Sequence, residues 1–183
     1  MINHIDVSVV LRGTVCDLYS NLVTRPTGAA VRAGIEEQLA EVGGRTLTVI
    51  DFSHVGLLDY SCADEIVAKL LIRHCAEDRG EVERFFLFRG ISEGHFDAIE
   101  AVLEHHGLAL VAEAPEGPRL LGAVDDGERE VWNVVCRLGG AAPPDVAVEA
   151  GLGSAEAEQL LESLWRRRVV MRIEDVYVPL GVR

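Results

Sequence analysis

Three of the six histidines lie on one predicted helix, together with two carboxylates that could share a metal ion with them. The residues are His95, His105 and His106, with Glu93 and Asp97 nearby. The His-x-x-x-His and Glu-x-x-His spacings of metal sites are absent. His95 and His106 are eleven positions apart, which is about 16 Å along a helix axis and too far for one ion. We therefore predict surface histidines and no metal site.

The four cysteines offer little nucleophilic or redox chemistry. Cys16, Cys62, Cys75 and Cys136 contain no Cys-x-x-Cys pair. His74 and Cys75 are adjacent, and adjacent residues on a helix point away from each other. We expect reduced cysteines in the core or on helices of a cytoplasmic protein. No glycine-rich phosphate loop is present either, so the sequence predicts no enzyme and no cofactor.

Asp59 and Ser61 lie between a predicted strand and a predicted helix. Thr46–Phe52 is a short apolar run rich in β-branched residues, which is typical of a strand buried on both faces. The loop Ser53–Asp59 follows, and from Ser61 the apolar residues recur at helical spacing. A helix start has free N–H groups that an Asp or Ser can cap and that would also stabilise a phosphate. Both roles remain open for these two residues.

The same stretch resembles a known family. The resemblance rests on D-F-S-H-V at Asp51–Val55, L-L-D at Leu57–Asp59, and S-C-A-D-E-I at Ser61–Ile66. It is similar to the STAS domain of anti-sigma-factor antagonists, and closer still to a STAS-like subgroup that carries S-F-A-D-E in this place. The resemblance implies an α/β fold, with a sheet that has helices on one side.

The resemblance also implies a phosphorylation site. In the antagonists the serine two places after the aspartate is phosphorylated by a partner serine kinase of the histidine-kinase ATPase fold, and here that serine is Ser61. Tyr60 and Cys62 depart from the family, which has a small residue and a glycine at these places. Separately, Arg25 precedes a helix expected to begin at Thr27, where it could meet an acidic partner or a phosphate or be solvated. The expected partner-binding surface comprises Asp59, Tyr60, Ser61, Cys62, Asp64 and Arg25.

Alternating strands and helices are expected over residues 1–123, the predicted STAS-like domain. The helices are expected from Thr27 to Gly43, from Ser61 onward, and from a cap at Ser92 to His106. Besides Thr46–Phe52, the strands are expected at Ile5–Leu11, Thr14–Tyr19, Arg84–Arg89, Leu108–Glu113 and Pro118–Val124.

Residues 124–127 are the predicted linker, and residues 128–183 resemble a small winged-helix domain of α+β type. Three helices are expected there, the last from a cap at Ser154 to Arg167, followed by strands Val169–Ile173 and Val176–Leu180. In this fold the third helix normally enters the major groove. DNA contacts would come from Gln159, Arg166, Arg167 and Arg168.

Charge and length limit the possible functions. The chain has 183 residues, 49% of them hydrophobic, and a net charge of −13, which argues against coating nucleic acid or an anionic membrane. No apolar run is long enough to span a bilayer, and the start does not resemble a signal peptide. We expect a regulatory protein that binds a protein partner, with a homodimer left open. A DNA-binding regulator is the first alternative, and a nucleotide or small-molecule sensor with a cleft beside Asp59 and Ser61 is the second.

Overall fold

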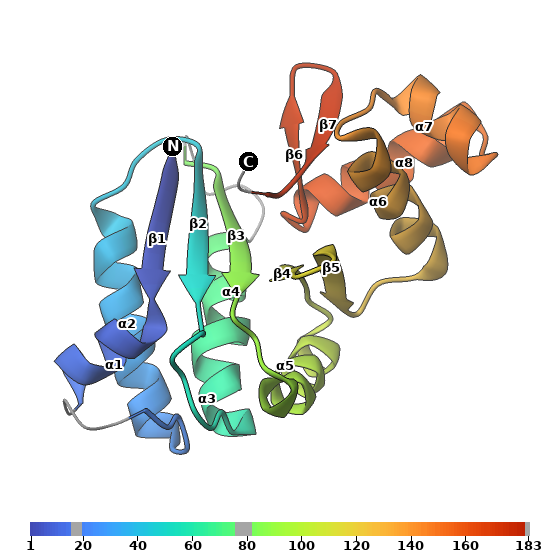
Figure 1. The fold of residues 1–183 in the computed structure, drawn as a ribbon. Helices are drawn as coiled ribbons and strands as arrows, with labels where there is room; N and C mark the ends of the chain where they lie inside the picture. The colour runs from blue at the N-terminus through green and yellow to red at the C-terminus, as the bar shows by residue number, and fades with distance from the viewer. Residues whose placement is uncertain (16–19, 76–81, 182–183) are drawn as a thin grey trace.

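The computed structural model describes residues 1–15, 20–75 and 82–181. In this part the chain has an α/β fold with a five-stranded mixed sheet and a small C-terminal β-hairpin (Figure 1). The strands of the sheet are β1 (Ile2–Asp6), β2 (Thr46–Asp51), β3 (Arg84–Arg89), β4 (Ala109–Ala114) and β5 (Gly117–Gly122). They lie in chain order, with β1 to β4 parallel and β5 antiparallel to β4.

The side chains of the sheet alternate between two hydrophobic clusters, because successive residues of a strand point to opposite faces. In β3, Phe86 and Phe88 belong to one cluster, whereas Phe85 and Leu87 belong to the other. Both faces are therefore covered. This confirms that Thr46–Phe52 contains a strand buried on both faces, since the first five residues of β2 are all buried.

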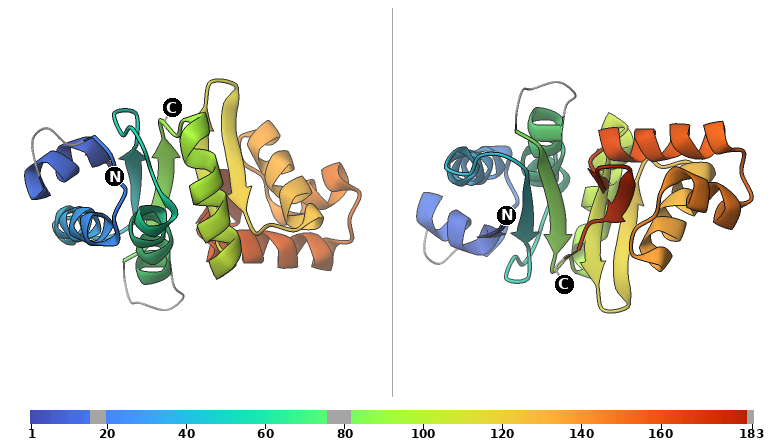
Figure 2. Two further views of the ribbon diagram at one scale, coloured as in Figure 1. Left: turned by 90° about the horizontal axis from the view of Figure 1, so that it is seen from below. Right: turned by 90° about the horizontal axis from the view of Figure 1, so that it is seen from above.

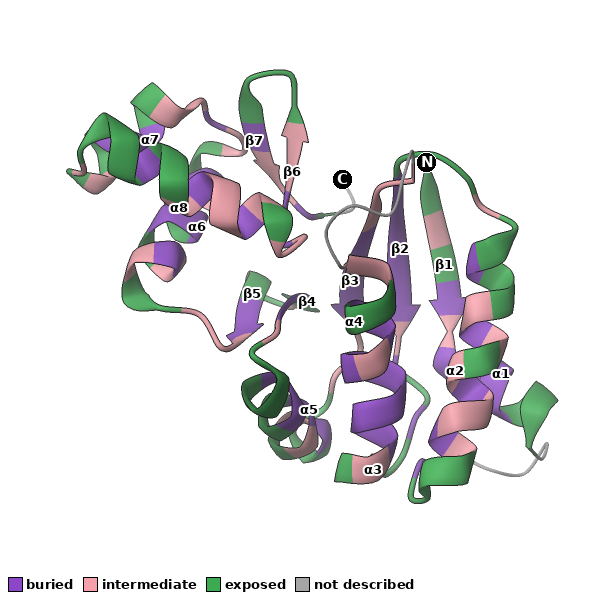
Figure 3. Cartoon of the chain, turned by 180° about the vertical axis from the view of Figure 1, so that it is seen from behind, coloured by how far each residue is buried: buried purple, intermediate pink, exposed green. Residues whose placement is uncertain are grey.

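Four helical segments pack on the face that contains Ile50, Phe86 and Phe88, which we call the helical face. They turn their buried sides toward the sheet and their exposed sides toward solvent (Figure 3). The segments are α1 (Val7–Thr14), α2 (Arg25–Ala40), the continuous helix α3 (Tyr60–Ala63), η1 (Asp64–Ala68) and α4 (Lys69–Cys75), and α5 (Glu93–His106). The middle part of the third segment, η1, is a π-helical turn.

The C-terminal segment packs on the opposite face, which contains Val49, Phe85, Leu87 and Val111 and which we call the C-terminal face. It lies beside β4 and β5, at the end of the sheet away from α1 and α2 (Figure 2). The segment consists of α6 (Asp126–Leu138), α7 (Pro143–Ala150), α8 (Ser154–Arg166), β6 (Val170–Ile173) and β7 (Val176–Pro179). Its core and the sheet share one hydrophobic cluster.

The expected strand Ile5–Leu11 is wrong beyond Asp6. The Asp6 carboxylate accepts hydrogen bonds from Ser8 N and Val9 N, so it caps α1. The buried residues of α1 include Val7, Val10 and Leu11, a helical i, i+3, i+4 set, whereas Val9 is exposed. The alternating apolar residues therefore span two elements: β1 ends at Asp6, and α1 begins at the next residue, Val7. The expected strand Thr14–Tyr19 fails at Thr14, which belongs to α1, and residues 16–19 lie outside the described part.

The predicted starts of three helices, α2, α6 and α8, also need correction. α2 begins at Arg25 with Thr24 as its cap, because Pro26 is favourable in the first helical turn, so the expected start at Thr27 is late. α8 is capped at Gly153 and not at Ser154. α6 begins inside the expected linker, where Asp125 caps it by accepting a hydrogen bond from Glu128 N at 2.8 Å.

The remaining elements lie where the sequence placed them, within one to three residues. β3 and α5 match the expected bounds, and Gly107 closes α5 in the left-handed conformation. The hairpin β6–β7 is also confirmed. The division into two domains stays a prediction. In the part of the chain described, no helix has the length and apolar character needed to cross a membrane.

Candidate functional site

The start of α3 carries the two residues that the sequence singled out. Asp59 caps the helix, with its Oδ1 accepting hydrogen bonds from Cys62 N and from the Ser61 hydroxyl, both at 2.8 Å. Burial raises the pKa of Asp59, but these hydrogen bonds outweigh it and hold the pKa below its usual value. Ser61 is partly exposed. Its hydroxyl is therefore held in place by a carboxylate, on a residue that is partly exposed.

The loop before Asp59 is fixed from two directions. His95, at the start of α5, is 1% exposed; its Nε2 lies 2.8 Å from Gly56 O, and its Nδ1 accepts the Ser92 N–H at 3.2 Å. On the other side, Asn21 Oδ1 accepts the Leu57 N–H at 3.0 Å. These contacts tie the loop to α5 and to the segment that carries Asn21. The expectation that His95 lies on the surface is wrong, because it bridges two backbone groups of different elements.

The starts of α2 and α3 converge. Cys62 Sγ donates to the Thr24 carbonyl at 3.0 Å, and Gly28 packs against Cys62 so closely that an added Cβ would lie 2.9 Å from its Cα. Only a glycine allows this approach without displacing backbone. As a result Arg25, 36 residues before Ser61 in the chain, lies over the same helix.

Arg25 belongs to a cluster of charges at the π-helical turn. Its Nη1 lies 2.6 Å from Asp64 Oδ2 and 2.8 Å from Glu65 Oε1. His106 Nε2 lies 2.7 Å from the other oxygen of Asp64. Burial raises the pKa of Asp64, but the hydrogen bonds from Arg25 and His106 outweigh it, so the net shift is downward. The side chains of the two carboxylates are only 10% and 4% exposed. Arg25 is therefore an internal ion-pair partner, although it keeps about half of its side chain in solvent.

Glu65 has two further cationic partners. Arg32 Nη2 lies 3.2 Å from its Oε2, and Lys69 contacts its Oε1. Burial raises the pKa of Glu65, but the contacts with Lys69, Arg25 and Arg32 lower it on balance. Glu65 was not among the predicted site residues, and its signal in the sequence is weak: an acidic pair inside an otherwise apolar helix, with the partners Arg32 and Arg25 lying 33 and 40 residues earlier in the chain.

Exposed apolar side chains flank Ser61. Val23, Leu57 and Tyr60 are 40%, 63% and 42% exposed. Leu22 and Leu58 form a parallel bridge, so Val23 and Leu57 come from two neighbouring segments, and Tyr60 begins the helix. Large exposed apolar residues beside a fixed polar group are typical of surfaces that bind proteins.

The described thiols are not activated. Burial raises the pKa of Cys62 to about 11 and the pKa values of Cys75 and Cys136 to about 12, so all three are protonated at neutral pH. Cys16 lies outside the described residues. In the ranges 1–15, 20–75 and 82–181, no group of three or more His, Cys, Asp or Glu side chains could hold a metal ion.

The proposed DNA-contacting arginines point in different directions. Arg167 lies 2.6 Å from the buried Glu128, and Arg168 lies 3.0 Å from Glu83, the residue before β3. Arg167 therefore links two parts of the C-terminal segment, whereas Arg168 links that segment to the residue before β3. Arg166 pairs with Glu162 at 3.1 Å. Gln159 is exposed on α8, in a groove that also carries the carboxylates Glu158 and Glu162.

Comparisons with protein-family models, with curated proteins and with solved structures gave no match.

Proposed function

We propose that this chain is a STAS-like regulatory module that binds a partner protein through the surface around Ser61, and that phosphorylation of Ser61 changes this binding. One observation carries the proposal: a partly exposed serine has its hydroxyl fixed at a helix start, and the neighbouring segments carry the exposed side chains of Val23, Leu57 and Tyr60. The helix layer on one face of the sheet is compatible with the STAS resemblance.

Phosphorylation would change this surface through local electrostatics. The Ser61 hydroxyl now donates to Asp59. A phosphoserine has no hydroxyl proton to donate and adds about −1.5 to −2 charges beside that carboxylate. The Ser61–Asp59 hydrogen bond would be lost and replaced by repulsion, so a partner that fits the unmodified surface would bind more weakly.

The proposed partners are a serine kinase of the histidine-kinase ATPase fold and a protein that distinguishes the two states of Ser61. Mass spectrometry of the native protein tests for the kinase, because its action would leave a phosphate on Ser61. For the second, Ser61→Asp should change the affinity for a captured partner more than Ser53→Asp, which adds the same charge at an exposed loop position. Equal effects of the two substitutions would count against the proposed switch.

DNA binding by the winged-helix-like segment has less support. Arg167 and Arg168 are engaged by Glu128 and Glu83, and the exposed side of α8 carries Glu156 and Glu158, which phosphates repel. A gel shift with Glu156→Ala/Glu158→Ala tests this alternative, since non-specific affinity should rise if α8 faces a duplex. An unchanged weak affinity would favour a protein-contact role.

A further inference from the structure

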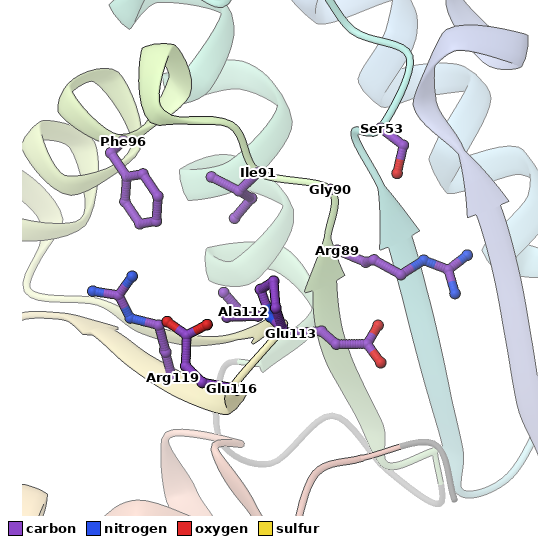
Figure 4. Close-up of a pocket in the computed structure, with 11 residues that line it drawn as sticks. Ser53, Arg89, Gly90, Ile91, Phe96, Ala112, Glu113, Glu116 and Arg119 are labelled. Atoms are coloured by element: carbon purple, nitrogen blue, oxygen red, sulfur yellow. The ribbon is translucent and has the colours of Figure 1, made fainter.

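A pocket of about 800 Å³ lies at the carboxyl ends of β3 and β4, between the start of α5 and the β4–β5 hairpin (Figure 4). Its volume is within the range of small-molecule sites. It is separate from the cleft expected beside Asp59 and Ser61, because neither residue lines it. The apolar part of its wall comes from Ile91, Phe96 and Ala112.

Arg119 stands at one side of this pocket, on the β4–β5 hairpin. The centre of its guanidinium lies 5.4 Å from the centroid of the Phe96 ring, and it forms no ion pair with any described residue. An arginine that stacks on an aromatic ring keeps its N–H edge free for a planar acceptor such as a carboxylate. The contact with Phe96 thus leaves the Arg119 guanidinium beside the apolar wall, where it can receive an anionic group.

Glu116 supplies the opposite charge next to Arg119. Figure 4 shows the two side chains next to each other on the hairpin that closes the pocket. Glu116 also forms no ion pair within the described residues, so it can accept hydrogen bonds from a cation. The second arginine of the pocket, Arg89, is already engaged: it is bound to Asp51 at 2.7 and 3.0 Å and faces Glu113. Arg119 and Glu116 therefore offer a ligand one positive and one negative group on the hairpin side of the pocket, and Glu113 is a further carboxylate beside Arg89.

We propose that this pocket binds a free amino acid with an apolar or aromatic side chain. The α-carboxylate would bind Arg119, the α-ammonium group would bind Glu116, and the side chain would pack between Ile91, Phe96 and Ala112. A purely anionic ligand would leave Glu116 repelled, and a purely cationic one would leave Arg119 repelled. The proposal concerns a second site and does not depend on phosphorylation of Ser61.

Calorimetric titration of the full chain with L-phenylalanine and L-leucine tests the proposal. Saturable binding of one of them is expected, whereas 3-phenylpropanoate, which lacks the ammonium group, and 2-phenylethylamine, which lacks the carboxylate, should bind at least about tenfold more weakly. No binding of either amino acid at millimolar concentration would overturn the proposal. Equal binding of 3-phenylpropanoate would overturn it too, since the site would then recognise only an anion.

Variants assign the contacts. Arg119→Gln and Glu116→Gln should each weaken the binding of L-phenylalanine at least about tenfold, because each removes one of the two charge contacts. Both residues are exposed, so the fold should be kept, which circular dichroism can check. Arg12→Gln, which removes an exposed arginine on α1, should leave the binding unchanged. If Arg119→Gln bound as tightly as the unmodified protein, the proposed site would be wrong.

Discussion

Arg25 Nη1 lies 2.6 Å from Asp64 Oδ2, and this ion pair joins the first residue of α2 to the π-helical turn that follows α3. π-Helical turns inside α-helices are frequent at functional sites. Here the turn places two adjacent, nearly buried carboxylates against cations from α2 and α4 and against the His106 imidazole of α5. The helix that carries Ser61 near its start is thus tied to α2 and α5 through these two carboxylates.

The Asp64 ion pair makes stability sensitive to acid. The folded-state pKa of Asp64 is depressed below the unfolded value of about 3.9, so its contribution is present above that pH and is lost as the pH falls through the folded value. Asp64→Asn should lower the free energy of unfolding at pH 7 by about 1–3 kcal/mol. The difference from the unmodified protein should shrink below pH ~4.

Urea unfolding at pH 7, 4.5 and 3 measures this effect. Asp97→Asn, at an exposed position of α5, serves as the control and should behave like the unmodified protein at each pH. A difference between Asp64→Asn and the unmodified protein that stays constant from pH 7 to pH 3 would show that the carboxylate charge is not the cause.

His95 should hold the loop that precedes Ser61. His95→Ala would leave the Gly56 carbonyl and the Ser92 N–H without their partner and would open a cavity, at a cost of about 2–4 kcal/mol. Hydrogen exchange of the amides between Ser53 and Asp59 should become faster. His105→Ala, at an exposed position on the same helix, is the control. Unchanged exchange in this loop would mean that other contacts fix it.

Gly28 should be needed for the approach of α2 to α3. In Gly28→Ala the new Cβ would lie 2.9 Å from Cys62 Cα, a contact with backbone that only a shift of one helix can relieve. Thermal or urea unfolding should show a loss of about 1–3 kcal/mol. Gly13→Ala provides the comparison, because no atom lies within 4 Å of its added Cβ, and it should be neutral or slightly stabilising. Similar losses for both variants would contradict the packing argument.

The C-terminal segment should be required for folding. A chain that stops at Ala123 would expose the C-terminal face of the sheet, including Val49, Phe85, Leu87 and Val111. An apolar surface of this kind favours aggregation, so we expect poor recovery and binding of a hydrophobic dye, measured beside the full chain. A monomeric fragment with cooperative unfolding would contradict this prediction and would support the division into two domains.

The sequence by itself determined the local elements whose signals agree with one another. β2 and β3 are apolar runs rich in β-branched or aromatic residues, α5 has a cap at Ser92 and a closing Gly107, and Asp59 is a good helix cap. It failed at Ile5–Leu11, because Ile5, Val7, Val9 and Leu11 alternate as in a strand, while Val7, Val10 and Leu11 also have the i, i+3, i+4 spacing of an amphipathic helix. Only the capping hydrogen bonds of Asp6 distinguish the two.

The tertiary structure decided which distant residues meet. Arg25 reaches Asp64, His95 reaches Gly56, and Arg168 reaches Glu83. Each contact joins side chains or backbone groups 39 or more residues apart, and nothing in local spacing encodes such a distance. The pocket beside Arg119 is likewise formed by residues of several elements that come together only when the sheet closes against α5. Helices and caps follow from short-range sequence, whereas ion pairs and cavities follow from how the finished elements pack.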